Sequence, residues 1–216
     1  MRVMAERVPL HLYLVTDRHQ THGRPLLEVV EAGLRGGVDA VQLREKDLPT
    51  DELTSLALVL VRLCRRYGAR LLINDRIDVA LAVGADGVHL PVNSFAIADA
   101  RYLLGDRLIA ASTHHPHEAY AAAQAGADFL VFGPVFDTPT KRTFGAPRGL
   151  AQLAEVTIGV EIPVLAIGGV TADTAATVRD CGAAGIAVVA AILRAADPRV
   201  AAARLRTQLG VPLTSR

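Results

Sequence analysis

Short apolar runs alternate along the chain with longer segments in which apolar positions recur at helical spacing. Eight runs have the length and residue types of buried strands: residues 11–16, 40–43, 70–73, 87–90, 108–111, 129–132, 163–167 and 185–189. The intervening segments predict helices at residues 25–36, 50–67, 77–83, 96–104, 116–124, 150–157, 171–180 and 198–208. Eight strand and helix pairs in strict alternation predict a (β/α)8 TIM barrel.

Four boundaries between a helix and the next strand repeat one phrase. GGVDAVQL, GADGVHL, GADFLVF and GAAGIAV each combine a helix-ending glycine, a turn of small residues and a strand. No linker or low-complexity segment interrupts this pattern, so we expect one domain over residues 1–216, with the barrel at about 11–209. Residues 142–148 (RTFGAPR) predict a mobile loop after the sixth strand, and whether it closes over a substrate stays open.

Composition and charge exclude several classes of protein. The 216 residues have a formal net charge of +1, which provides no global basic field for nucleic acid. No apolar run approaches the roughly 18 to 20 residues of a membrane span, and the start of the chain lacks a signal-peptide core, so we expect a cytoplasmic protein. The two cysteines form no metal-binding motif. Alanine-rich outer helices make a homodimer plausible.

The active site of a TIM barrel lies at the carboxyl ends of its strands, so the residues that follow each run are the candidates for chemistry. Polar and charged residues are found there after the second, third and sixth strands. The expected substrate-binding residues of this set are Gln42, Arg44, Lys46, Asn74, Thr138, Thr140 and Lys141. Arg44 and Lys46 would hold an anionic group such as a carboxylate or diphosphate. Lys141 and the hydroxyls of Thr138 and Thr140 would close over a second anion, a phosphate, from the loop after the sixth strand.

Two further turns predict a phosphate site. Gly168 and Gly169 follow the seventh strand, and Val189 and Ala190 follow the eighth, where backbone N–H groups at a helix start commonly bind phosphate. The alternative is that the two glycines only permit a tight turn. We therefore expect a phosphorylated small-molecule substrate.

Proton transfer and metal binding each have one candidate. His114 follows the fifth strand directly and titrates near neutral pH, so we expect it to be the catalytic residue. His89 falls inside the fourth strand and is expected to be packed. Asp75 offers one carboxylate for Mg²⁺, but the equivalent position after the fourth strand holds only Asn93 and Ser94, so we expect no metal, with Asp75 as the ligand only if the activity is one that requires Mg²⁺.

These motifs carry a family resemblance. LYLVTD, VQLREK, LLINDRIDVALAVGADGVHL, STHHPHEA, TPTK, IPVLAIGG and GIAVV resemble the thiamine phosphate synthase superfamily in order, from about Leu12 to Pro198. The resemblance implies one of two activities. A synthase joins hydroxymethylpyrimidine diphosphate to thiazole phosphate with Mg²⁺, whereas a thiazole tautomerase (TenI-like) aromatises a carboxythiazole phosphate by a proton shift without a cofactor.

Departures from the synthase pattern favour the tautomerase at this stage. Synthases usually carry an aspartate where Ser94 stands and a serine where Ala190 stands, and the HLP..SF stretch is similar to the tautomerase group. In a tautomerase the resemblance assigns His114 as the base. The intact QLREK, Asn74-Asp75 and TPTK segments support the synthase as the alternative. A non-catalytic ligand-binding regulatory barrel is the third possibility.

Overall fold

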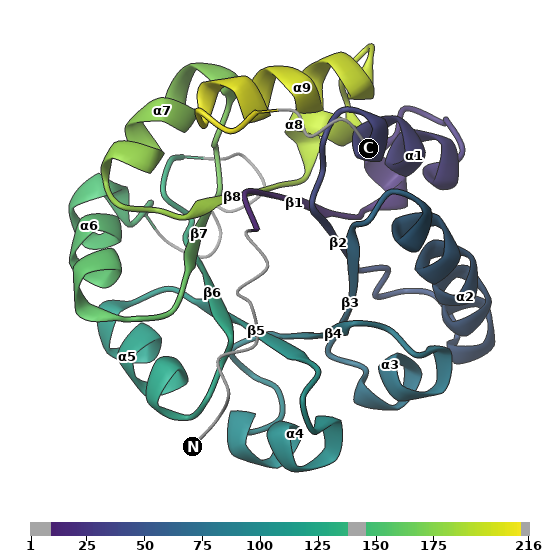
Figure 1. Cartoon of the computed structure of the whole chain (residues 1–216), viewed down its shortest axis with the longest axis horizontal. Coiled ribbons are helices and arrows are strands. Elements are labelled where there is room, and N and C mark those ends of the chain that lie inside the picture. The colour runs from purple at the N-terminus through teal and green to yellow at the C-terminus, as the bar shows by residue number, and fades with distance from the viewer. Residues whose placement is uncertain (1–9, 138–145, 213–216) are drawn as a thin grey trace.

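The computed structural model describes residues 10–137 and 146–212. The chain forms a closed barrel of eight parallel strands inside a ring of helices (Figure 1). Each strand pairs with its neighbours in chain order, and β1 closes the barrel against β8. The strands are β1 Leu12–Val15, β2 Ala40–Leu43, β3 Arg70–Asn74, β4 Gly87–Leu90, β5 Leu108–Thr113, β6 Phe129–Phe132, β7 Val164–Ile167 and β8 Gly185–Val188. The predicted single-domain TIM barrel is confirmed.

Helices follow the strands on the outside of the barrel, as the sequence pattern predicts. They are α1 Leu26–Arg35, α2 Thr50–Arg66, α3 Ile77–Val83, α4 Ile97–Leu104, α5 Pro116–Gln124, α6 Gly149–Gly159, α7 Ala172–Asp180 and α9 Pro198–Gln208. Two short elements were not predicted: the 3-10 turn η1 (Arg18–Gln20) and α8 (Ala190–Leu193). Neither is long enough to show a helical period. In the described ranges, no helix is long and apolar enough to cross a membrane.

Four strand ends differ from the prediction near the barrel mouth, and the first is β1, which ends at Val15, one residue early. Asn74 and Ser112, expected after their strands, pair with His89 of β4 and Val131 of β6 and so lie inside β3 and β5. Because the side chains at these positions are polar, the apolar run ends before the strand does. The hydrogen bonds between strand backbones do not depend on side-chain polarity, so the strand continues. At β8 the strand ends one residue early, because Val189 already has a ψ angle of −84° and begins the turn into α8.

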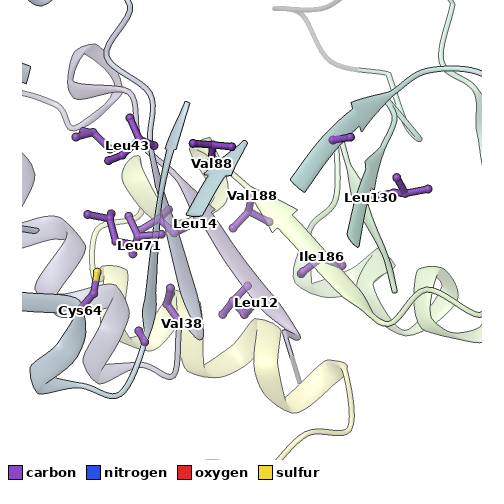
Figure 2. Close-up of a cluster of buried hydrophobic side chains, with 14 of the residues drawn as sticks. Leu12, Leu14, Val38, Leu43, Cys64, Leu71, Val88, Leu130, Ile186 and Val188 are labelled. Atoms are coloured by element: carbon purple, nitrogen blue, oxygen red, sulfur yellow. The ribbon is translucent and has the colours of Figure 1, made fainter. Parts of the chain in front are cut away.

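The buried side chains form two layers on opposite sides of the sheet. An outer layer lies between strands and helices, and Figure 2 shows part of it, including Leu12, Leu14, Leu71 and Cys64. An inner cluster includes the strand residues that alternate with these, such as Tyr13 and Leu72. Successive side chains of a strand point to opposite faces, so the inner cluster fills the lumen of the barrel.

The repeated phrase before the strands has a structural reason. In three of its four copies it carries an aspartate: Asp39, Asp86 and Asp128. Each carboxylate accepts a hydrogen bond from the backbone of the preceding strand and pairs with an arginine. The backbone donors are the N–H groups of Leu12 (3.0 Å), Leu71 (2.9 Å) and Ile109 (2.7 Å), and the paired arginines are Arg206, Arg70 and Arg101. These aspartates tie adjacent strands together at the end of the barrel opposite the strand carboxyl ends.

Candidate active site

The lumen changes from apolar to polar toward the carboxyl ends of the strands. Ala40, Leu72 and Ala110 belong to the inner cluster. Two residues further along the same strands stand Gln42, Asn74 and Ser112, on the same face. Gln42 is buried, and its side-chain amide acts on the Tyr13 hydroxyl and lowers the pKa of that group, but among the described residues its nitrogen has no well-formed hydrogen bond. A buried amide without a well-formed hydrogen bond is costly, which makes Gln42 a candidate to bind a ligand at the mouth.

His89 of β4 links this polar layer to the interior. Its ring is buried, with Nδ1 3.3 Å from the Tyr13 hydroxyl oxygen and Nε2 2.7 Å from Ser112 Oγ. Burial, and to a smaller extent the positive charge of Arg44, together lower the pKa of His89 to about 3. His89 is packed, as expected, and it is neutral at physiological pH.

The fold brings Asp75 and Ser94 together although 19 positions separate them. Asp75 follows β3 with a positive φ of 65°, and its backbone N–H donates to the carbonyl of His89 over 2.9 Å. Ser94, in the loop after β4, donates a hydrogen bond from its hydroxyl to the Asp75 carboxylate. Among the described residues, no three histidine, cysteine or acidic side chains gather as a metal site. This pair therefore offers one carboxylate and one hydroxyl.

His114 stands directly after β5, as predicted. Its ring Nδ1 contacts the carbonyl of Gly133 at the end of β6, and its backbone N–H donates to the Glu118 carboxylate over 2.6 Å. Because a carbonyl oxygen only accepts, Nδ1 carries the proton and Nε2 of the neutral ring is an acceptor. His114 is thus held in one orientation at the rim.

The two predicted cations after β2 are positioned by an ion-pair cluster. Glu45, which stands between Arg44 and Lys46, is buried and pairs with Arg18 (3.2 Å), and Arg18 also pairs with Asp47. The same guanidinium lowers the pKa of Asp47 well below its usual range. These contacts fix the loop after β2, with Arg44 half-buried and Lys46 exposed.

Close packing accounts for the two glycines after β7. Gly168 and Gly169 have φ angles of 93° and 67°, and an added Cβ would lie 2.5 Å from Pro134 and 2.7 Å from Phe136. The tight turn alone is therefore enough to require glycine at both positions, whether or not a phosphate binds there. Val189 caps α8 without a side-chain hydrogen bond, and Ala190 is the first residue of that helix.

Three predicted substrate-binding residues lie outside the described part of the chain: Thr138, Thr140 and Lys141. The same holds for residues 142–145 of the predicted loop.

Comparison with known proteins decides the family. Residues 12–192 match the family model described as thiamine monophosphate synthase. This chain belongs to that family. A protein of Geobacter sulfurreducens is 53% identical, with 89% of this chain and 91% of the relative covered. The thiamine-phosphate synthase of Chloroflexus aurantiacus is 45% identical, with 96% of both chains covered.

A solved structure agrees with this membership. The thiamine phosphate pyrophosphorylase of Pyrococcus furiosus is 39% identical and superposes with a TM-score of 0.87, with 94% of this chain and 97% of the other covered. The tautomerase assignment favoured by the sequence is wrong, because family relatives matched along almost their whole length are named as thiamine-phosphate synthases. It relied on Ser94 and Ala190, and two positions carry less weight than similarity along the whole chain.

The sequence search overlooked two polar residues of this site. Tyr13 was taken as part of an apolar strand, and Ser112 was grouped with the loop after β5. The available signal was strand periodicity: counting in steps of two from the last residues of each strand identifies the polar side chains that face the lumen.

Proposed function

We propose that this chain is a thiamine-phosphate synthase, a transferase that joins hydroxymethylpyrimidine diphosphate to thiazole phosphate. The observation that carries the proposal is the 45% identity, over 96% of both chains, to a relative named thiamine-phosphate synthase. In the reaction, the thiazole nitrogen forms a bond to the methylene carbon of the pyrimidine as the bond from that carbon to the diphosphate oxygen breaks. Diphosphate leaves with the bonding electrons.

The residues at the mouth suit this chemistry. Arg44 and Lys46 provide positive charge on one side, where a diphosphate leaving group needs it. The turns at Gly168, Gly169, Val189 and Ala190 are proposed to bind the phosphate of the thiazole. Thr138, Thr140 and Lys141 keep their predicted role of closing over that same phosphate.

Polar groups deeper in the mouth would orient the organic parts of the two substrates. The side-chain amide of Gln42 offers a hydrogen-bond donor, and Asn74 stands on the same face one strand further along. His114 keeps a place in the proposed site as a hydrogen-bond acceptor through Nε2, and no longer as the base of an isomerase.

The residues present also fit Mg²⁺ of the kind that binds together with a substrate. Magnesium commonly uses one or two protein carboxylates, with substrate phosphates and water completing the octahedron. Asp75 is such a carboxylate, and Ser94 lies beside it. When bound, the ion would neutralise charge on the departing diphosphate. The structure thus favours a site in which the protein supplies a single carboxylate.

The test is turnover by the purified chain with both substrates, with and without EDTA. We expect thiamine phosphate and diphosphate to form, and EDTA to stop the reaction. Asp75→Asn removes the proposed ligand, while Asp78→Asn is a matched control because Asp78 is exposed and pairs with Arg76. Absence of product from the unmodified chain, or full activity of Asp75→Asn, would refute the proposal.

Two sequence-based expectations remain predictions. A cytoplasmic location and a homodimer both agree with a small-molecule enzyme of this kind, and size measurement in solution would test the second.

A further inference from the structure

A line of polar contacts crosses the barrel from its interior to the mouth. Tyr13 of β1 is fully buried, and its hydroxyl lies 3.3 Å from His89 Nδ1 on β4. On the other side of the imidazole, Nε2 lies 2.7 Å from the hydroxyl of Ser112 on β5. Ser112 is half-buried, so the line ends where a substrate would enter.

The surroundings of Tyr13 determine the direction of the first hydrogen bond. Its ring packs edge-on against Phe129, and its neighbours in the lumen are largely apolar. Burial raises the pKa of Tyr13 and outweighs the side-chain amide of Gln42, which acts as a donor toward the hydroxyl and lowers this pKa, so the phenol keeps its proton. Among the described residues, His89 Nδ1 is the acceptor found for this hydroxyl. A buried hydroxyl that donates to no acceptor is costly, so Tyr13 donates and Nδ1 accepts.

The second hydrogen bond then has a fixed direction as well. A neutral imidazole carries one proton, and when Nδ1 accepts, that proton is on Nε2. The Nε2–H group of His89 therefore donates to Ser112 Oγ. In the other tautomer Ser112 would have to donate its own proton to the ring, and only its lone pairs would remain for a ligand.

We propose that Tyr13 is a positioning residue that holds His89 in the Nε2–H tautomer and thereby leaves the Ser112 hydroxyl free to donate a hydrogen bond to the bound substrate. The identity of that substrate rests on the proposed function. The direction of the two internal hydrogen bonds does not, because it follows from burial and donor–acceptor chemistry alone.

The tautomer can be measured in the full chain by ¹⁵N NMR of labelled histidines. The His89 signals are assigned by their loss in His89→Gln. We expect the unmodified chain to show a protonated Nε2 and an unprotonated Nδ1, and Tyr13→Phe to show a mixture of both tautomers. Tyr67→Phe is the matched control, because it removes a hydroxyl that bonds Glu31 on the outer surface, and it should leave the His89 signals unchanged.

Steady-state kinetics distinguish a positioning role of Tyr13 from a general loss of structure. Tyr13→Phe should lower kcat about tenfold, which is the value of one well-made hydrogen bond, and leave both KM values within about twofold. Ser112→Ala should cost a similar factor, and the double variant should cost little more than either single variant because both act through one chain of contacts. Tyr67→Phe should keep the kcat of the unmodified chain.

Two results would overturn the proposal: an Nδ1–H tautomer in the unmodified chain, or a Tyr13→Phe variant with unchanged His89 signals and kcat. Should Tyr13→Phe fail to fold, the tautomer of the unmodified chain still decides between the two directions. Failure of the proposed function would give a different result, namely absence of product from the unmodified chain. In that case the NMR experiment still supports or overturns the tautomer assignment by itself.

Discussion

The pair formed by Asp39 and Arg206 allows a quantitative test of what holds the barrel closed. Arg206, on α9, lies 2.6 Å from Asp39 at the start of β2, and only 4% of each side chain is exposed. Arg206→Met keeps most of the side-chain volume but leaves the Asp39 charge buried. Removing one partner of a buried pair costs about 3–5 kcal/mol. We expect the free energy of unfolding to fall by that amount.

The chain contains its own control for this experiment. Arg70 and Asp86 occupy the equivalent turn two strands further along, but 41% of the arginine side chain is exposed. Such surface pairs contribute about 0–1 kcal/mol, so Arg70→Met should be nearly neutral. Urea unfolding of both variants at one pH measures the difference. Equal losses in the two variants would refute the claim that burial, and not the pairing itself, determines the cost.

A double variant tests the origin of the loss at Asp39. Combining Asp39→Asn with Arg206→Met would keep a side-chain oxygen for the Leu12 N–H group, now 3.0 Å from the carboxylate, and would remove the buried charge. The double variant should therefore recover at least half of the stability lost in Arg206→Met. No recovery would mean that the lost guanidinium contacts to backbone carbonyls, such as that of Gly37 at 2.7 Å, dominate.

Three other predictions follow from the site and its supports. Ser94→Asp places a second carboxylate beside Asp75, so this variant should bind Mg²⁺ more tightly than the unmodified chain. With the metal alone, at about ten times the Kd of the variant for Mg²⁺, the variant should be stabilised by about 1 kcal/mol more than the unmodified chain, measured as the shift in Tm. An equal Tm shift in both proteins would contradict this prediction. Gly168→Ala should lower the free energy of unfolding by about 2 kcal/mol or more, because φ is 93° and the new methyl group would lie 2.5 Å from Pro134; an unchanged urea midpoint would show that the turn relaxes. Burial lowers the pKa of His89 from 6.5 to about 3. Between these two pH values the folded chain binds fewer protons than the unfolded chain, so acid favours unfolding. The free energy of unfolding should therefore fall by about 2 kcal/mol from pH 7 to pH 5. His89→Gln should lose less stability over that range, and equal pH dependence in both proteins would be evidence against a neutral buried imidazole.

The order of elements was predictable because its signals are local. Apolar runs such as residues 129–132 and helix-ending glycines such as Gly84 act within a few residues of their own position, and eight alternating units leave a closed barrel as the expected arrangement. The same locality explains the boundary errors. Ser112 belongs to β5 because its backbone pairs with β6, and this pairing cannot be predicted from the sequence of β5 alone.

The face on which each strand residue lies was harder to predict. Strands of a parallel barrel are buried on both sides, so they lose the alternation of apolar and polar residues that marks the solvent side of other sheets. Tyr13 between two leucines therefore gave no sign that it faces the lumen. The tautomerase assignment failed for a different reason: it gave the single positions Ser94 and Ala190 more weight than the similarity along the whole chain.

By itself, the sequence determined the alternation of strands and helices, the barrel, and the positions of the strand ends where chemistry is expected. Only the tertiary structure decided which of those positions meet, such as Asp75 with Ser94 and Tyr13 with His89 and Ser112. The physical reason is distance along the chain. Local propensities act over a few residues, whereas closing the barrel sets a register between strands that brings side chains such as Tyr13 and His89, 76 positions apart, into hydrogen-bond contact.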